Sequence, residues 1–280
     1  MDDIKPGLIV TADDFGYSSS VNRAIEKAAR QGILTCASLM MNGGAVQEAV
    51  EIARSLPSLG VGLHLNLTEG KPLSPEYPSF LRSQQGDFHP SQPRTGILLQ
   101  FFSVAQKAIE AEVKAQFEAF FHTGLPFTHV DCHHHFHVHP KLFSLVLQYA
   151  QEYKLKTMRI PYEPWEISGS LCPEHKMRNY FYRKVFGILT SSGRKKIEKT
   201  PLLSADGVFG LYKTGEITEE WVMQLLDRLD GKKGIFELYT HPADQSCNME
   251  FQALLSQKIR EKIQRIQLLR YHEISERKRI

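Results

Sequence analysis

The chain has 280 residues, of which 42% are hydrophobic and 23% charged, the composition of a folded globular protein with enough apolar material for a large core. These values exclude a disordered chain, a collagen-like repeat and a disulfide scaffold. With 34 basic and 31 acidic residues, the formal net charge of +3 is too balanced to predict nucleic-acid binding. The unusual count is 12 histidines, six of which lie between His129 and His139.

The sequence carries no recognisable export or membrane-spanning signal. Its acidic start lacks the basic region and long apolar stretch of a signal peptide, and no apolar run approaches the roughly 20 residues that span a bilayer. The four cysteines form no CxxC pair and are expected to be reduced thiols. We therefore expect a cytoplasmic protein, with peripheral attachment to the inner membrane surface as an open alternative.

Short apolar strands alternate with amphipathic helices along the chain. The expected elements are a strand at 7–12, a helix from Ser18 or Ser19 to Gly32, a strand at 34–40, a helix at 45–56, a strand at 61–67, a long helix through Ile109 and Phe121, a strand at 128–132, a helix at 141–153, a strand at 156–160, a helix at 219–229 and a strand at 234–239. This alternation predicts an α/β fold with a parallel sheet, most simply one TIM-like (β/α) barrel domain over residues 1–280.

Two stretches interrupt the alternation. Residues 69–100 contain five prolines and little periodicity, so we expect a long loop over one face of the barrel. Residues 161–205 form a basic insertion, in which residues 176–199 hold eight basic residues and a single acid among many aromatic and aliphatic ones. Two interpretations stand: a solvated, partly helical lid, or a segment that attaches to an anionic membrane surface.

Polar residues follow the predicted strands at the point where each strand ends. Since the carboxyl ends of parallel barrel strands meet on one face, we expect these residues to surround one pocket. They are Asp13, Asp14, His64, His133, Arg159 and His241.

One carboxylate and two imidazoles are a common ligand set for a divalent metal that keeps positions open for water and substrate. Adjacent side chains at a strand end point in different directions, so one of Asp13 and Asp14 can bind a metal while the other handles a proton. Such a set suits zinc, iron, manganese, nickel or cobalt. His64 is the natural second imidazole, and an unliganded His241 suits a general acid.

The histidine cluster cannot all reach one metal. An extended start would place residues 129, 131, 133 and 135 on one face and His134 on the other. We expect at most two or three ligands here, and we predict substrate contacts for His135 and His137. Arg159 has three interpretations: it holds Asp13 ionised, it binds substrate oxygens, or it makes a salt bridge at the barrel rim.

No GxSxG, P-loop or GxGxxG motif occurs, and Cys132 lacks the setting of a nucleophile, so metal-activated water remains as the chemistry. Alternatives are another metallohydrolase, such as a phosphoesterase or a two-metal amidohydrolase, and a non-catalytic metal-binding or sugar-binding protein.

The ordered motifs resemble those of the YdjC-like carbohydrate deacetylases, and within them the hopanoid-biosynthesis-associated branch. The resemblance rests on residues 11–16, 32–35, 62–65, 70–72, 128–137, 158–164 and 239–243. It implies a TIM-like barrel, often a homodimer, that removes acetyl groups from N-acetylated sugars, a lipid-linked N-acetylglucosamine in the hopanoid branch or chitooligosaccharides elsewhere.

Carried over by position, the resemblance makes Asp14, His64 and His133 ligands of one divalent metal, with magnesium also allowed. It makes Asp13 the general base and His241 the general acid. Cys132 stands where the family commonly has serine, a small change beside a ligand that we expect the site to tolerate.

Overall fold

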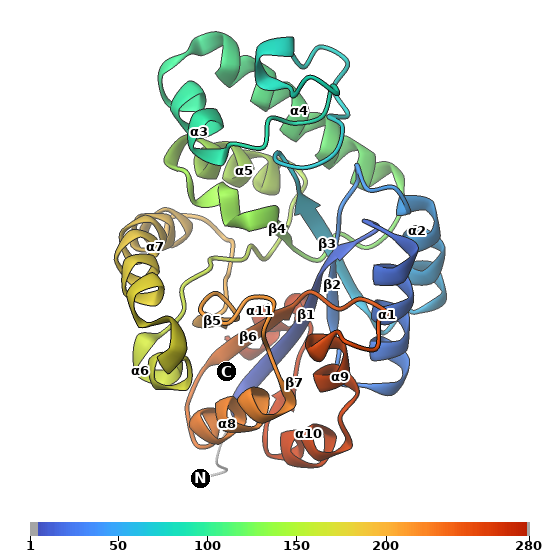
Figure 1. Cartoon of the computed structure of the whole chain (residues 1–280), viewed down its shortest axis with the longest axis vertical. Helices are drawn as coiled ribbons and strands as arrows, with labels where there is room; N and C mark the ends of the chain where they lie inside the picture. Colours follow the sequence, from blue (N-terminus) through green and yellow to red (C-terminus); the bar gives the residue numbers. More distant parts are fainter. Residues whose placement is uncertain (1–4, 279–280) are drawn as a thin grey trace.

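A curled parallel sheet occupies the centre of the molecule (Figure 1). The computed structural model describes residues 5–278, except the side chain of residue 175. The strands are β1 (Gly7–Phe15), β2 (Cys36–Leu39), β3 (Gly60–Leu65), β4 (Val130–Cys132), β5 (Gly207–Phe209), β6 (Ile235–Thr240) and β7 (Gln267–Leu268). Their order is β4-β3-β2-β1-β6-β5, with β7 paired to the start of β1. All these pairings are parallel, so the carboxyl ends of the strands lie along one edge.

Helices surround this sheet and extend beyond it. They are α1 (Ser19–Gln31), α2 (Val46–Ser55), α3 (Gln92–Phe101), α4 (Ser103–His122), α5 (Pro140–Glu152), α6 (Trp165–Ser168), α7 (Lys176–Ile197), α8 (Glu219–Leu229), α9 (Met249–Leu255), α10 (Gln257–Lys262) and α11 (Ile274–Arg277). Single 3₁₀ turns lie at Ser79–Leu81, Gly169–Leu171, Pro173–His175, Ile263–Arg265 and Tyr271–Glu273, and a longer 3₁₀ segment at His133–Val138.

Local sequence signals place several helix ends. The side chain of Ser18 accepts a hydrogen bond from the Val21 N–H at the start of α1, and Thr218 does the same for Trp221 at the start of α8. Pro140 occupies the first turn of α5, where its missing N–H costs nothing. The predicted helices in these regions are confirmed to within a few residues.

The α/β class and the parallel sheet are confirmed, but the barrel does not close fully. The predicted strand at 156–160 is wrong as a regular strand, because it makes only single bridges, Met158 to Val130 on β4 and Thr157 to Leu203. Pro161 follows at once, and the Tyr162 carbonyl accepts a hydrogen bond from Val208 on β5. Irregular backbone therefore spans the gap between the two edge strands, β4 and β5.

The predicted long loop at 69–100 is also partly wrong, because α3 begins at Gln92. Ser91 caps this helix by accepting from the Arg94 N–H, and Pro93 lies in its first turn. Its apolar residues, Ile97 to Leu99 and Phe101, do not form one helical stripe, so periodicity gave no signal. Within the basic insertion, α7 is one continuous helix. Helical structure was expected there under the interpretation of the segment as a partly helical lid.

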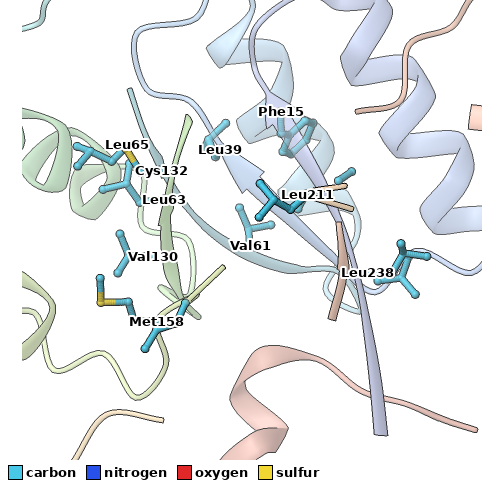
Figure 2. Packing of buried hydrophobic residues seen from close by; sticks show 14 of the residues in the cluster. Phe15, Leu39, Val61, Leu63, Leu65, Val130, Cys132, Met158, Leu211 and Leu238 are labelled. Atoms are coloured by element: carbon cyan, nitrogen blue, oxygen red, sulfur yellow. The ribbon is translucent and has the colours of Figure 1, made fainter. Parts of the chain in front are cut away.

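The larger part of the core lies between the sheet and the helices that cover it. Figure 2 shows apolar side chains of this cluster on neighbouring strands, including Phe15, Leu39, Leu63 and Val130. Met158 packs with them, although its segment is not a regular strand. All four cysteines are free thiols, as expected. Close packing of this core fixes the strand ends that carry the polar residues described next.

Candidate metal and catalytic site

The carboxyl ends of β1, β4 and β6 open into a cavity of about 650 Å³. Five of the residues predicted from strand ends and from the histidine cluster line it: Asp13, Asp14, His133, His135 and His241. Its far wall comes from the helical segments, which contribute Gln92, Arg178, Tyr182 and Phe186. The basic insertion therefore covers the edge of the sheet where the polar residues gather.

The end of β1 turns both neighbouring aspartates toward this cavity. A register shift between Ala12 and Phe15 interrupts the pairing with β2, and Asp14 adopts a left-handed backbone with φ of 64°. Aspartate tolerates this conformation better than most residues. The carboxylates still differ in their partners, as predicted: Asp13 contacts Arg159, and Asp14 contacts two histidines.

Asp14, His64 and His133 offer three ligand atoms to one point. Asp14 Oδ1 lies 2.9 Å from His133 Nδ1 and 3.2 Å from His64 Nε2, and the two ring nitrogens are 3.3 Å apart. Asp14 Oδ1 is buried and has no partner of good hydrogen-bond geometry among the described residues. His64 Nδ1 donates to Asp131 Oδ1 at 2.7 Å, the arrangement that orients metal-binding imidazoles. These donors fit a divalent cation.

Two other groups of side chains could be considered as ligand sets. Asp13, His64 and Asp131 lie close together, but the Arg159 guanidinium, 2.6 to 2.7 Å from both carboxylates, opposes a second cation. Glu69 lies 3.4 Å from both His133 and His134, yet Glu69 and His134 are each more than 40% exposed. The Asp14 set is favoured for three reasons. Its two histidines are buried, Asp14 Oδ1 lacks a hydrogen-bond partner among the described residues, and His64 is oriented by its hydrogen bond to Asp131.

The titration of this group also indicates a place for positive charge. Burial lowers the pKa of His64, but Asp131 and Asp13 outweigh it and raise that pKa to about 10. Burial raises the pKa of Asp14, yet the adjacent His133 and His64 imidazoles hold it well below its usual range. These shifts favour positive charge between Asp14 and the two imidazoles, so cation binding is expected to release protons.

Arg159 lies behind the cavity rather than on its wall. It is fully buried and forms two parallel bonds to Asp13, of 2.7 and 2.9 Å, and further bonds to Asp131 and Glu237. Tyr271 donates to Glu237, and the Tyr239 ring lies 5.1 Å from the guanidinium. Burial opposes its charge, but the surrounding carboxylates raise the pKa of Arg159 well above its usual value. Of the three interpretations of Arg159, this arrangement fits the one in which Arg159 pairs with Asp13.

Removing this guanidinium is expected to destabilise the fold strongly. Arg159→Met leaves three buried carboxylates without their shared cation, so we expect a loss of about 3–5 kcal/mol in the free energy of unfolding. Urea denaturation of Arg23→Met is the control, since Arg23 pairs with Asp244 at the surface and should cost under about 1 kcal/mol. Equal losses in the two variants would contradict the assigned role.

The strand ends at Cys132 as predicted, but the extended backbone expected to continue through residue 135 does not form. β4 ends at Cys132, and both His134 and His135 have left-handed backbones, so the expected alternation breaks after His133. His134 consequently lines the cavity together with His133 and His135. His137 is buried and donates from Nε2 to the Arg159 carbonyl at 3.0 Å. Of the two histidines predicted to contact substrate, only His135 therefore lines the cavity, and Arg159, for which substrate binding was one interpretation, does not line it.

His241 follows β6 and faces the cavity from the side opposite His133. Its backbone N–H donates to the buried Glu250, and its Nδ1 lies 3.7 Å from the same carboxylate. Burial lowers the pKa of His241, but Glu250 and the two aspartates raise it to about 9. The imidazole is therefore protonated at neutral pH.

Sequence reasoning missed several residues that position the site. Asp131 and Glu237 are buried acids within short, mostly apolar strands. An acid that interrupts an apolar run was the sequence signal that could have identified them. Glu69, Gln92 and the inner face of α7 reach the site from segments without strand periodicity. Their approach depends on how the helices pack, which local patterns do not encode.

The curled sheet and its buried carboxylate–imidazole centre define an α/β protein built to hold charged groups at the carboxyl edge of parallel strands. The family model described as YdjC-like protein matches residues 7–265. The chain belongs to this family.

Named relatives cover most of the chain. A carbohydrate deacetylase of Brevibacillus brevis is 34% identical over 237 residues, which cover 84% of this chain and 81% of the relative. A chitooligosaccharide deacetylase of Proteus mirabilis is 30% identical over 246 residues, with the same shares covered. A crystal structure from Enterococcus faecalis V583, a protein suggested to cleave cellobiose phosphate, matches with a TM-score of 0.74 and 26% identity, covering 96% of this chain and 98% of the other.

Proposed function

We propose that this protein is a metal-dependent hydrolase that removes the acetyl group from an N-acetylated amino sugar, releasing acetate and the free amine. The observation that carries the proposal is the shared cavity of about 650 Å³: Asp13, Asp14, His133 and His241 line it, and His64, the third member of the Asp14 ligand set, is buried next to Asp14 and His133. The relatives named carbohydrate deacetylases support the same reaction.

Asp14, His64 and His133 would hold one divalent ion. Their two imidazoles and one carboxylate suit zinc, iron, manganese, nickel or cobalt, and the family resemblance admits magnesium, although magnesium prefers oxygen ligands. When bound there, the ion supplies polarisation of the acetyl carbonyl and lowers the pKa of water.

The chain's own groups would move the protons. Asp13, held in one orientation by Arg159, would take the proton of the attacking water. His241, protonated at neutral pH, would donate to the departing amine. His135 would contact the sugar: its Nδ1 has no hydrogen-bond partner among the described residues, and its ring meets Tyr239 edge-on at 5.0 Å.

A falling alkaline limb in the pH profile is expected from His241. Its acid form is the active one and predominates below the raised pKa of about 9, so kcat/KM should decrease as pH rises through about 9. His241→Asn should lower the plateau about a hundredfold and remove this limb. Retention of the limb in His241→Asn, with rates measured between pH 6 and about 10.5, would contradict the assignment.

The N-acetylated substrate has two candidates. Chitooligosaccharides are one, on the strength of the Proteus mirabilis relative. The second is a lipid-linked N-acetylglucosamine such as a hopanoid conjugate, and it is favoured by an apolar groove of about 570 Å³ beside the cavity. Gln92 borders both spaces, and Ile97, Phe101, Val185 and Leu189 line the groove.

Product analysis distinguishes the reaction classes. Incubation with N-acetylglucosamine conjugates carrying either a sugar or an alkyl aglycone should release acetate and a free amine in equal amounts. Phosphate release from sugar phosphates without acetate release would indicate a phosphoesterase. Saturable binding without turnover would indicate a non-catalytic sugar-binding protein. If KM is lower for the alkyl conjugate than for the sugar conjugate, and Phe101→Ser abolishes this difference, the lipid-linked substrate is favoured.

A further inference from the structure

The outer side of α7 carries a surface that the proposed reaction does not use. Met177, Phe181, Lys184, Ile188 and Lys195 are spaced three, four or seven residues apart and so lie on one side of the helix, here called the α7 face. Met177 is 88% exposed, Phe181 63% and Ile188 73%. Large apolar side chains this exposed along one helix indicate an interaction surface.

Charge on this part of the molecule has one sign. The sequences of α3 and α7 together hold eight basic residues and no aspartate or glutamate. Lys184, Lys195 and the hydroxyls of Ser191 and Ser192 border a shallow surface hollow. None of the lysines on the α7 face forms an ion pair with another described residue. The surface is therefore complementary to anions.

Beside the α7 face, further apolar side chains connect α7 with α3. Val185 and Leu189 of α7 share the apolar groove with Ile97 and Phe101 of α3, and Phe101 is 74% exposed. Figure 1 shows α3 and α7 at the periphery of the molecule. No helix within residues 5–278 is long and apolar enough to cross a membrane.

We propose that the α7 face docks on the surface of an anionic lipid bilayer. Aromatic and aliphatic side chains interleaved with lysines are the pattern of helices that lie at a bilayer interface, because the apolar groups enter the acyl boundary while lysine stems extend to the headgroups. A second copy of the chain fits less well, since two such faces without acidic residues repel each other. The inner side of α7 lines the cavity, so docking places the cavity near the bilayer.

Vesicle sedimentation tests this proposal without depending on the hydrolytic reaction. The full chain should bind vesicles of phosphatidylcholine and phosphatidylglycerol mixed at about two to one, and not pure phosphatidylcholine, at low salt. Lys184→Gln with Lys195→Gln should weaken binding about fivefold per lysine, and Phe181→Ser with Ile188→Ser at least about tenfold. Lys232→Gln with Lys233→Gln, exposed before β6 at the opposite end of the strands, is the control and should bind as wild type.

Each outcome bears on the proposal. Absence of vesicle binding at low salt, or full binding by both α7 variants, overturns it. So does a dimer in sedimentation velocity that the Phe181/Ile188 variant abolishes, because a second copy then covers the face. Hydrolysis of a soluble N-acetylated sugar should be equal in all variants, since these residues do not line the cavity. Loss of vesicle binding with that hydrolysis intact supports docking, and failure of hydrolysis in wild type overturns only the proposed function.

Discussion

Asp13→Asn is expected to lower kcat for acetate release about a thousandfold while leaving the metal content unchanged. Asparagine cannot accept the proton of the attacking water, yet it keeps an oxygen acceptor for Arg159. Arg159 also retains Asp131 and Glu237, so its charge remains paired and the fold should persist. Steady-state rates and elemental analysis of the purified variant measure the two quantities.

Asp14→Asn is the matched control, because it changes the neighbouring carboxylate in the same way. It weakens the ligand set, so metal content and rate should fall together. If Asp13→Asn kept activity within tenfold of wild type, or lost its metal as Asp14→Asn does, Asp13 would not be the base.

His64→Ala should weaken metal binding at least about a hundredfold. The ring contributes Nε2 to the Asp14 set and is oriented by Asp131, which after the substitution still accepts from Ser38 and Arg159. The fold should therefore survive the loss of the imidazole. Titration of the apo form with zinc or manganese, followed by calorimetry, gives the affinity.

His134→Ala is the informative comparison for His64→Ala. It belongs to the alternative set with Glu69 and should bind metal as wild type does. If His134→Ala lost the metal and His64→Ala kept it, the ion would lie in the Glu69 set instead.

The position of a polar residue at a predicted strand end was the sequence signal that best identified the residues lining the cavity. The residues at or just after the ends of β1, β4 and β6 reach one cavity because parallel strands bring their carboxyl ends to the same edge. The prediction that both Asp13 and Asp14 face the pocket is confirmed, but the register shift and the left-handed Asp14 backbone at this strand end could not be predicted. The position of His134 had the same origin, because two left-handed residues end the alternation.

Features set by tertiary packing escaped prediction. The sequence left three interpretations of Arg159 open, and its complete burial follows from three carboxylates contributed by separate strands. α3 has no amphipathic stripe; it packs against α4 and α5, and a groove lies between it and α7. The barrel stays open where the strand expected at 156–160 makes only single bridges and is followed by Pro161.

The central claim, that a divalent ion held by Asp14, His64 and His133 is needed for deacetylation, is tested most directly by removing and restoring metal. Acetate release from an N-acetylglucosamine conjugate should fall to background after chelation and return when one equivalent of divalent metal is added to wild type. His64→Ala should not recover under the same addition. Undiminished acetate release by protein shown to be metal-free would contradict the claim.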